Sequence, residues 1–162
     1  MLNNEHREEM GCRHMEERKV CVIGDSEISA DKLECVQREL EREIGAALDE
    51  GCKTFVVEYR EGAGMLFARC VAGRRGEYPD IFLEAVLPPN PDQLDRDLLA
   101  GCSAVKPLCE DCQQDYPLSV TRYLVGQAER VLVVCGEQPD RDTTYALDYA
   151  RTMGRDLRII EI

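Results

Sequence analysis

Three short segments of this sequence each follow a predicted strand and lead into a predicted helix through residues that can hold a small molecule. Gly24, Asp25 and Ser26 form the first turn, Arg60 to Gly64 form the second, and the third begins at Gly136. Glycines let the backbone approach a phosphate, and the following helix offers unpaired N–H groups and the positive end of its dipole. The three turns are therefore candidate anion-binding sites.

The third turn, "GEQPDRDTTYALDYA", is the most informative of the three. Thr143 and Thr144 are expected in the first turn of the last helix, where hydroxyls and backbone donors point the same way. Asp142 is the predicted cap of that helix, and an ordinary capped helix remains the alternative interpretation. Arg141 would pair either with a bound anion or with Asp140.

The other two turns also allow two interpretations each. Gly24 lacks the G-x-G-x-x-G pattern, and Asp25 would repel a phosphate but suits hydrogen bonding to a ribose or a base. Arg60 would be the counter-charge of a phosphate held by Gly62 and Gly64, or these glycines would only allow close helix packing. Any anion is therefore expected at the second and third turns rather than at the first.

The elements that position these turns alternate between strand and helix along the chain. Apolar runs that end on glycine or proline predict strands, and apolar residues at helical spacing predict helices between them. Asp31 and Glu34 form a predicted capping box for the first helix, which Gly51 ends. Strands are expected at 19–24, 53–59, 80–89, near 104–106, at 130–136 and at 156–162.

This alternation predicts a Rossmann-like three-layer α/β/α sandwich with a mostly parallel sheet. Ligands of such folds bind beyond the carboxyl ends of the strands, where the strand order reverses. The 162 residues suit one domain, expected at 18–162, and the polar segment 1–17 is predicted to be a mobile tail.

The formal charge of −12 argues against nucleic acid as a partner, because phosphate backbones require a basic surface. No apolar run reaches the roughly 20 residues of a membrane helix, and no signal peptide is recognisable. A soluble, cytoplasmic protein without a membrane partner is therefore expected.

Catalytic and metal-binding residues are not predicted. The nine cysteines are spread singly, as buried hydrophobes are, and Cys109 and Cys112 lack further ligands close by for a zinc site. Both histidines, His6 and His14, lie in the tail. Acid–base chemistry would then rest on carboxylates such as Glu61, so the protein is expected to bind a ligand rather than to act as an enzyme.

The order of motifs resembles the YpsA-like family of the SLOG superfamily, which includes Smf/DprA and LOG proteins with Rossmann folds. "EYPDIFLEAVLPP" is similar to the family's "YP-x-I-x-L" strand, and "DTTYALDYARTMGRDLRIIEI" to its last helix and strand. The resemblance carries site residues onto Gly24, Gly62, Arg122, and Thr143 or Thr144. Where the family has a glycine and an acidic residue, this chain has Tyr59 and Gly64.

The resemblance implies a domain that binds a nucleotide or a nucleotide-derived small molecule in a sensing or regulatory role, with the ligand and any cofactor unidentified. Two alternatives stay open. One is a nucleoside monophosphate phosphoribohydrolase of the LOG type, and the other is a protein-interaction domain with a vestigial pocket. Relatives often form homodimers, so a second copy of the chain is a further candidate partner.

Overall fold

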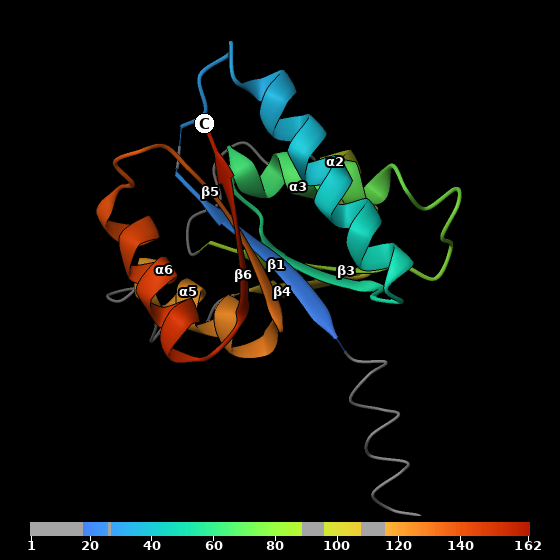
Figure 1. Ribbon diagram of the computed structural model, residues 1–162. Helices are drawn as coiled ribbons and strands as arrows, with labels where there is room; N and C mark the ends of the chain where they lie inside the picture. The colour runs from blue at the N-terminus through green and yellow to red at the C-terminus, as the bar shows by residue number, and fades with distance from the viewer. Residues whose placement is uncertain (1–17, 26, 89–95, 108–115) are drawn as a thin grey trace, which may run out of the picture.

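Eleven elements alternate between strand and helix in the computed structural model, which describes residues 18–25, 27–88, 96–107 and 116–162 (Figure 1). The predicted alternation is confirmed, and the predicted tail at 1–17 lies outside the described residues. The elements are β1 (Lys19–Gly24), α2 (Leu33–Asp49), β2 (Thr54–Glu58), α3 (Ala63–Ala72), β3 (Phe82–Leu87), α4 (Arg96–Ala100), β4 (Ala104–Pro107), α5 (Tyr116–Gln127), β5 (Arg130–Cys135), α6 (Arg141–Thr152) and β6 (Asp156–Glu161).

The six strands form one sheet in the order β4-β3-β2-β1-β5-β6, and every neighbouring pair is parallel. From β1 the chain first builds outward through β2, β3 and β4, and then returns to the other side of β1 with β5. The order therefore reverses between β1 and β5, which is where open parallel sheets bind ligands. Gly24, which pairs with Val134, ends β1 at this position, and Gly136 follows the last residue of β5.

Helices cover both faces of the sheet, which makes it a Rossmann-like three-layer sandwich (Figure 1). Alternate residues of one strand serve opposite cores, because side chains in a strand point to opposite faces. Val20 and Val22 of β1 are buried among residues of α2 and α3, whereas Cys21 is buried among residues of α5 and α6. Continuous apolar strands such as "RVLVVC" are the sequence signature of this double burial.

Two predicted helix starts and one predicted stripe are wrong in detail. Helix α2 has Lys32 at its N-cap and no side-chain cap among the described residues, so the box of Asp31 and Glu34 does not form. Helix α6 is capped by Asp140 and not by Asp142. Met153 follows Ala146 and Ala150 at helical spacing, which predicts a buried side chain, yet it is 42% exposed. No helix in the described ranges is long and apolar enough to cross a membrane.

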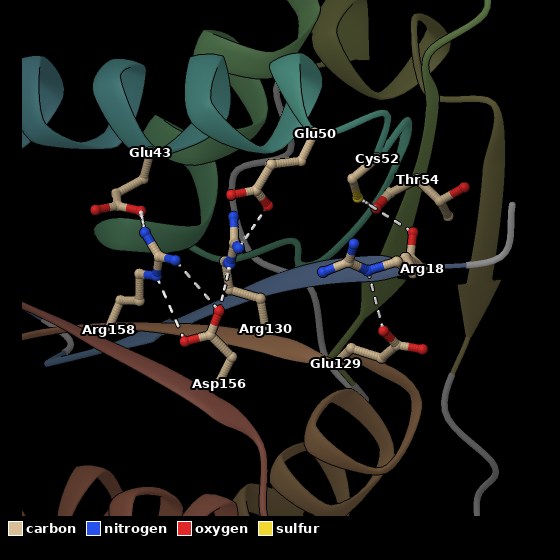
Figure 2. A network of polar contacts seen from close by, with 9 residues as sticks. All are labelled: Arg18, Glu43, Glu50, Cys52, Thr54, Glu129, Arg130, Asp156 and Arg158. Atoms are coloured by element: carbon tan, nitrogen blue, oxygen red, sulfur yellow. Dashed lines mark hydrogen bonds and ion pairs between the residues drawn. The ribbon is translucent and has the colours of Figure 1, made fainter. Parts of the chain in front are cut away.

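A network of ion pairs lies at the amino ends of β5 and β6 (Figure 2). Arg130 opens β5 and is 5% exposed; its guanidinium donates to Asp156 at 2.8 Å and to Glu50 at 2.6 Å. Arg158 also donates to Asp156, and it donates to Glu43 of α2 at 3.3 Å. The network joins α2 to both β5 and β6, so it holds one helical layer against this half of the sheet.

Candidate functional site

The three predicted turns converge at the carboxyl ends of β1, β2 and β5. Residues from all three line a cavity of about 60 Å³, and residues from all three also line a wider groove of about 850 Å³. Asp25 and Glu61 line both spaces, so the cavity and the groove are neighbours. The placement follows from the parallel sheet, whose strand ends meet at one edge.

Asp25 ties the first turn to the third. Its carboxylate accepts a hydrogen bond from the backbone N–H of Asp140 at 3.2 Å and from that of Gly136 at 3.4 Å, and its own N–H donates to Val134 O at 3.0 Å. A carboxylate that accepts backbone hydrogen bonds is well suited to hold a loop in place. Asp25 therefore positions the residues of the third turn, and the predicted contact to a ribose or base stays a prediction.

Gly24 and Gly64 allow the start of α3 to lie close against the sheet. A Cβ atom on Gly24 would be 2.8 Å from Ala63 Cβ and 3.0 Å from Val134 O, and one on Gly64 would be 2.2 Å from Glu58 O. No real side chain tolerates the second distance, so the packing itself requires glycine there. Both glycines also line the small cavity.

The N-terminus of α3 is open. Its N-cap is Gly62, which has φ 99° and ψ −137°, a backbone conformation accessible almost only to glycine. No side chain among the described residues caps this helix. The Met65 N–H donates to Arg60 O at 3.1 Å, so in the first turn the N–H groups open to a ligand are those of Ala63 and Gly64. The Arg60 guanidinium stands nearby and lies 3.8 Å from the carboxylate of Glu58.

The N-terminus of α6 is closed by the protein's own carboxylate. Asp140 Oδ1 accepts from the backbone N–H of Thr143 at 2.8 Å, and the Thr144 hydroxyl donates to the Asp140 carbonyl at 2.9 Å. Asp140 thus occupies the position that an anion would need, and the predicted role of Thr144 in ligand binding competes with this bond. Thr143 is 1% exposed and lines the cavity.

The two spaces differ in charge. Five carboxylates line the cavity against the guanidinium of Arg60 alone, whereas three carboxylate side chains line the groove against Lys32 and Arg69. Two like charges 4 Å apart repel by about 1 kcal/mol in water and by about 4 kcal/mol at the effective dielectric of a protein surface. An anion is therefore strongly disfavoured in the cavity and much less so in the groove.

Burial and the negative charges near the cavity both affect the thiol of Cys135. Burial raises its pKa, and the carboxylates of Asp25, Glu161 and Asp140 raise it further. Deeper in the sheet, burial raises the pKa of Cys21 to about 12. Both thiols are protonated at neutral pH, so neither is a nucleophile under ordinary conditions.

Among the described residues, two predicted site residues, Arg122 and Thr144, line neither space. Arg122 is exposed on α5 and is not among the described lining residues of either space. Ser26 lies outside the described residues, as do Cys109 and Cys112. Within the described part of the chain, no three His, Cys, Asp or Glu side chains are placed to hold a metal ion.

The structure adds lining residues that the sequence did not suggest. Lys32 and Arg69 reach the groove from α2 and α3, and Thr121 reaches the cavity from α5. Thr121 directly precedes the predicted site residue Arg122, so the sequence pointed to that segment. Nothing in the sequence pointed to Lys32 or Arg69, because neither lies in one of the three turns. The aliphatic part of the groove is formed by Ile28, Leu33, Met65, Leu66 and Ile162.

Comparison of the chain with protein-family models and with curated proteins finds no match to either.

Proposed function

We propose that this protein binds a nucleotide or a nucleotide-derived small molecule in the groove between α2 and α3, in a sensing or regulatory role. One observation carries the proposal: α3 begins without a side-chain cap among the described residues, and its N-cap Gly62, at φ 99°, lines a groove of about 850 Å³ at the point where the strand order reverses. Unpaired N–H groups and a helix dipole at such a position favour an anionic group.

The groove also has charges of the sign that a phosphate needs. Lys32 and Arg69 line it together with Gly62. The α6 N-terminus, where the resemblance to YpsA-like proteins implies ligand contacts, already holds the carboxylate of Asp140. The phosphate of a nucleotide is therefore assigned to the α3 end of the groove.

The rest of the groove suits a base. Leu33 is 41% exposed, and with Ile28, Met65 and Leu66 it gives the groove an aliphatic wall. A flat heterocycle that covers this wall would remove its apolar surface from water, which is worth about 25 cal/mol per Å². The combination of an apolar wall and a few polar groups is usual for small-molecule sites.

A binding role is favoured over catalysis by the chemistry of the lining. The described residues that line the groove and the cavity include neither a histidine nor a cysteine. The carboxylates that remain are partly engaged, as Asp25 and Asp140 are with backbone N–H groups. These hydrogen bonds hold the loops in place and occupy carboxylate oxygens that a general base would need.

The proposal is tested by measuring the thermal midpoint of the full chain with AMP, ADP-ribose, NAD and cyclic nucleotides, followed by calorimetric titration. Ligand at about 100 times its Kd should stabilise the fold by about 2.7 kcal/mol. Chromatography of the AMP sample for free adenine separates binding from hydrolysis. No change in midpoint with any of these compounds at millimolar concentration would contradict the proposal.

Removing the charge of Lys32 tests the site itself. Lys32→Met should weaken binding of AMP, whereas Lys106→Met, on the edge strand β4, is the matched control and should bind as the wild type does. Equal affinities of the two variants would mean that the phosphate does not lie in the groove.

A further inference from the structure

The groove of the proposed nucleotide site continues into an inner pocket between α2 and α3. This inner pocket has a volume of about 190 Å³ and shares Gln37, Leu66 and Arg69 with the groove. Both helices follow a strand of the parallel sheet and return beside each other toward its amino edge (Figure 1). The inner pocket therefore extends the groove along the two helices. Its remaining lining residues are Glu41, Cys70, Gly73 and Arg74.

The distance along α3 suits a nucleotide whose phosphate lies at the N-cap Gly62. Cys70 follows Gly62 by eight residues, which is about 12 Å along a helix that rises about 1.5 Å per residue. Leu66 lies half-way between them and belongs to the aliphatic wall proposed for the base. A base that covers this wall therefore reaches the inner pocket with the edge that is far from the phosphate.

The inner pocket has charges of both signs around one buried thiol. Cys70 is 8% exposed, Glu41 reaches the pocket from α2, and Arg74 reaches it from just beyond α3. Burial raises the pKa of the Cys70 thiol, the Glu41 carboxylate raises it further, and the Arg74 guanidinium lowers it, so both charges act on the same thiol. Arg74 Nη2 also donates to Glu41 O at 3.4 Å, which holds the guanidinium against α2. A two-oxygen acceptor and a fork of N–H donors thus line one pocket.

Guanine is the base that matches this pair of groups. One edge of guanine has two neighbouring acceptors, O6 and N7, which a guanidinium binds bidentately, and another edge has two neighbouring donors, N1–H and the 2-amino group, which suit a carboxylate. Adenine presents a donor beside an acceptor, N6 and N7, and this pattern suits an amide such as that of Gln37. The Gln37 amide donates to the Glu41 carboxylate at 3.4 Å, so its nitrogen is directed at that carboxylate and not at a base.

We infer that the site selects guanine nucleotides, with Arg74 donating to O6 and N7 of the base and Glu41 accepting from N1–H and the 2-amino group. The inference rests on the proposed nucleotide function and adds the identity of the base to it. AMP has the same phosphate as GMP and a base that covers the same apolar wall. It should therefore bind at the same place with lower affinity.

Calorimetric titration of the full chain with GMP and with AMP tests the inference. GMP should bind at least roughly tenfold more tightly, as expected for one bidentate contact to a base. Equal affinities would overturn the inference and leave the nucleotide proposal intact. No binding of either compound at millimolar concentration would contradict both.

Glu41→Gln tests the carboxylate, because glutamine keeps the size of the side chain and replaces one acceptor oxygen by a donor. The quantity to compare is the ratio of the AMP Kd to the GMP Kd, since a general change in the packing of α2 weakens both nucleotides alike. This ratio should fall from roughly ten to roughly one. Glu34→Gln is the matched control on α2 and should keep the wild-type ratio. Its side chain is 90% exposed and is not among the described lining residues of the groove or the inner pocket.

Arg74→Lys tests the guanidinium, because lysine keeps the positive charge and loses the bidentate fork. The ratio of the two Kd values should fall here as well. Arg151→Lys, at an exposed position of α6, is the control and should keep the wild-type ratio. If either Glu41→Gln or Arg74→Lys keeps the wild-type preference for GMP, the inference is wrong.

Discussion

Helices α3 and α6 both begin at the carboxyl edge of the sheet, yet their N-termini are chemically opposite. Helix α3 begins after Gly62 without a side-chain cap among the described residues, and Gly62 lines a groove that also contains Lys32 and Arg69. Helix α6 begins with the Asp140 carboxylate bonded to the Thr143 N–H and opens on an acid-lined cavity. The start of α3 can accept an anion, whereas the start of α6 already binds the carboxylate of Asp140.

The difference shows that a strand–turn–helix junction does not by itself make a phosphate site. Both helices have the same dipole direction at this edge, so the dipole cannot decide between them. What decides is whether a side chain of the protein has taken the free N–H groups. At α6 this side chain is Asp140, and at α3 a glycine leaves the position open.

The largest expected effect comes from displacing α3. Gly64→Ala places a methyl group 2.2 Å from Glu58 O, so the helix must move away from β2. We expect a loss of about 3 kcal/mol in the free energy of unfolding and a loss of nucleotide binding. Chemical denaturation measures the first and calorimetry the second.

Gly126→Ala is the control for that change, because an added Cβ at this exposed glycine of α5 would contact nothing within 4 Å. It should be neutral or slightly stabilising. A stable Gly64→Ala variant that still binds nucleotide would show that close packing of α3 against β2 is not required for stability or for binding.

A smaller effect is expected at the other helix start. Asp140→Ala removes the cap of α6 and should cost about 1 kcal/mol of unfolding free energy. Asp140→Asn keeps a good cap without the charge, so its stability should stay within about 0.5 kcal/mol of the wild type. Denaturation of the two variants side by side measures the difference.

Asp140→Asn also sharpens the contrast between the two helix ends. Without that carboxylate the cavity is less negative, so nucleotide binding in the neighbouring groove should be unchanged or stronger. If Asp140→Asn destabilises the fold as much as Asp140→Ala does, the cap is not what holds the start of α6.

The smallest expected effect comes from Asp156, at the amino end of β6, and it leaves the starts of α3 and α6 unchanged. Burial alone would raise the pKa of Asp156, but hydrogen bonds from Arg130 and Arg158 outweigh it and hold that pKa below its usual value. The resulting stability is present above about pH 4 and is lost as the pH falls through the folded-state pKa. Because Asp156 is 46% exposed, the contribution should be well under 1 kcal/mol.

Acid titration of the unfolding free energy measures this contribution. Asp156→Asn should flatten the acid limb of the stability curve and leave nucleotide affinity as it is. A change in affinity would mean that the two edges of the sheet are coupled.

The fold could be predicted from the sequence because its signals are local. Continuous apolar runs such as "RVLVVC" and the stripe of Val36, Leu40 and Ile44 have the periods of buried strands and amphipathic helices. The cap of α6 was predicted two residues late. Its true position depends on Asp25, whose carboxylate binds the N–H of Asp140 from 115 residues away in the chain.

The site was predicted only in part for a related reason. Side chains of neighbouring residues on a helix point about 100° apart. The resemblance to the family predicts a site residue at Arg122, but Arg122 is exposed, and Thr121, one residue earlier, lines the cavity instead. Lys32 and Arg69 meet in the groove through the packing of α2 on α3, which no sequence spacing reveals. The sequence predicts which residues form the turns. It does not predict which charged side chains lie near the starts of α3 and α6.

The most direct test of the central claim compares two glycine variants by calorimetric titration with AMP. Gly62→Ala and Gly51→Ala both force alanine into a positive-φ backbone, at 99° and 90°, and each should lose about 1–2 kcal/mol of stability. Gly51 lies at the far end of α2, where an added Cβ contacts nothing within 4 Å. The open N-terminus of α3 predicts at least roughly tenfold weaker binding by Gly62→Ala and wild-type affinity for Gly51→Ala. Equal affinities in the two variants would contradict the account.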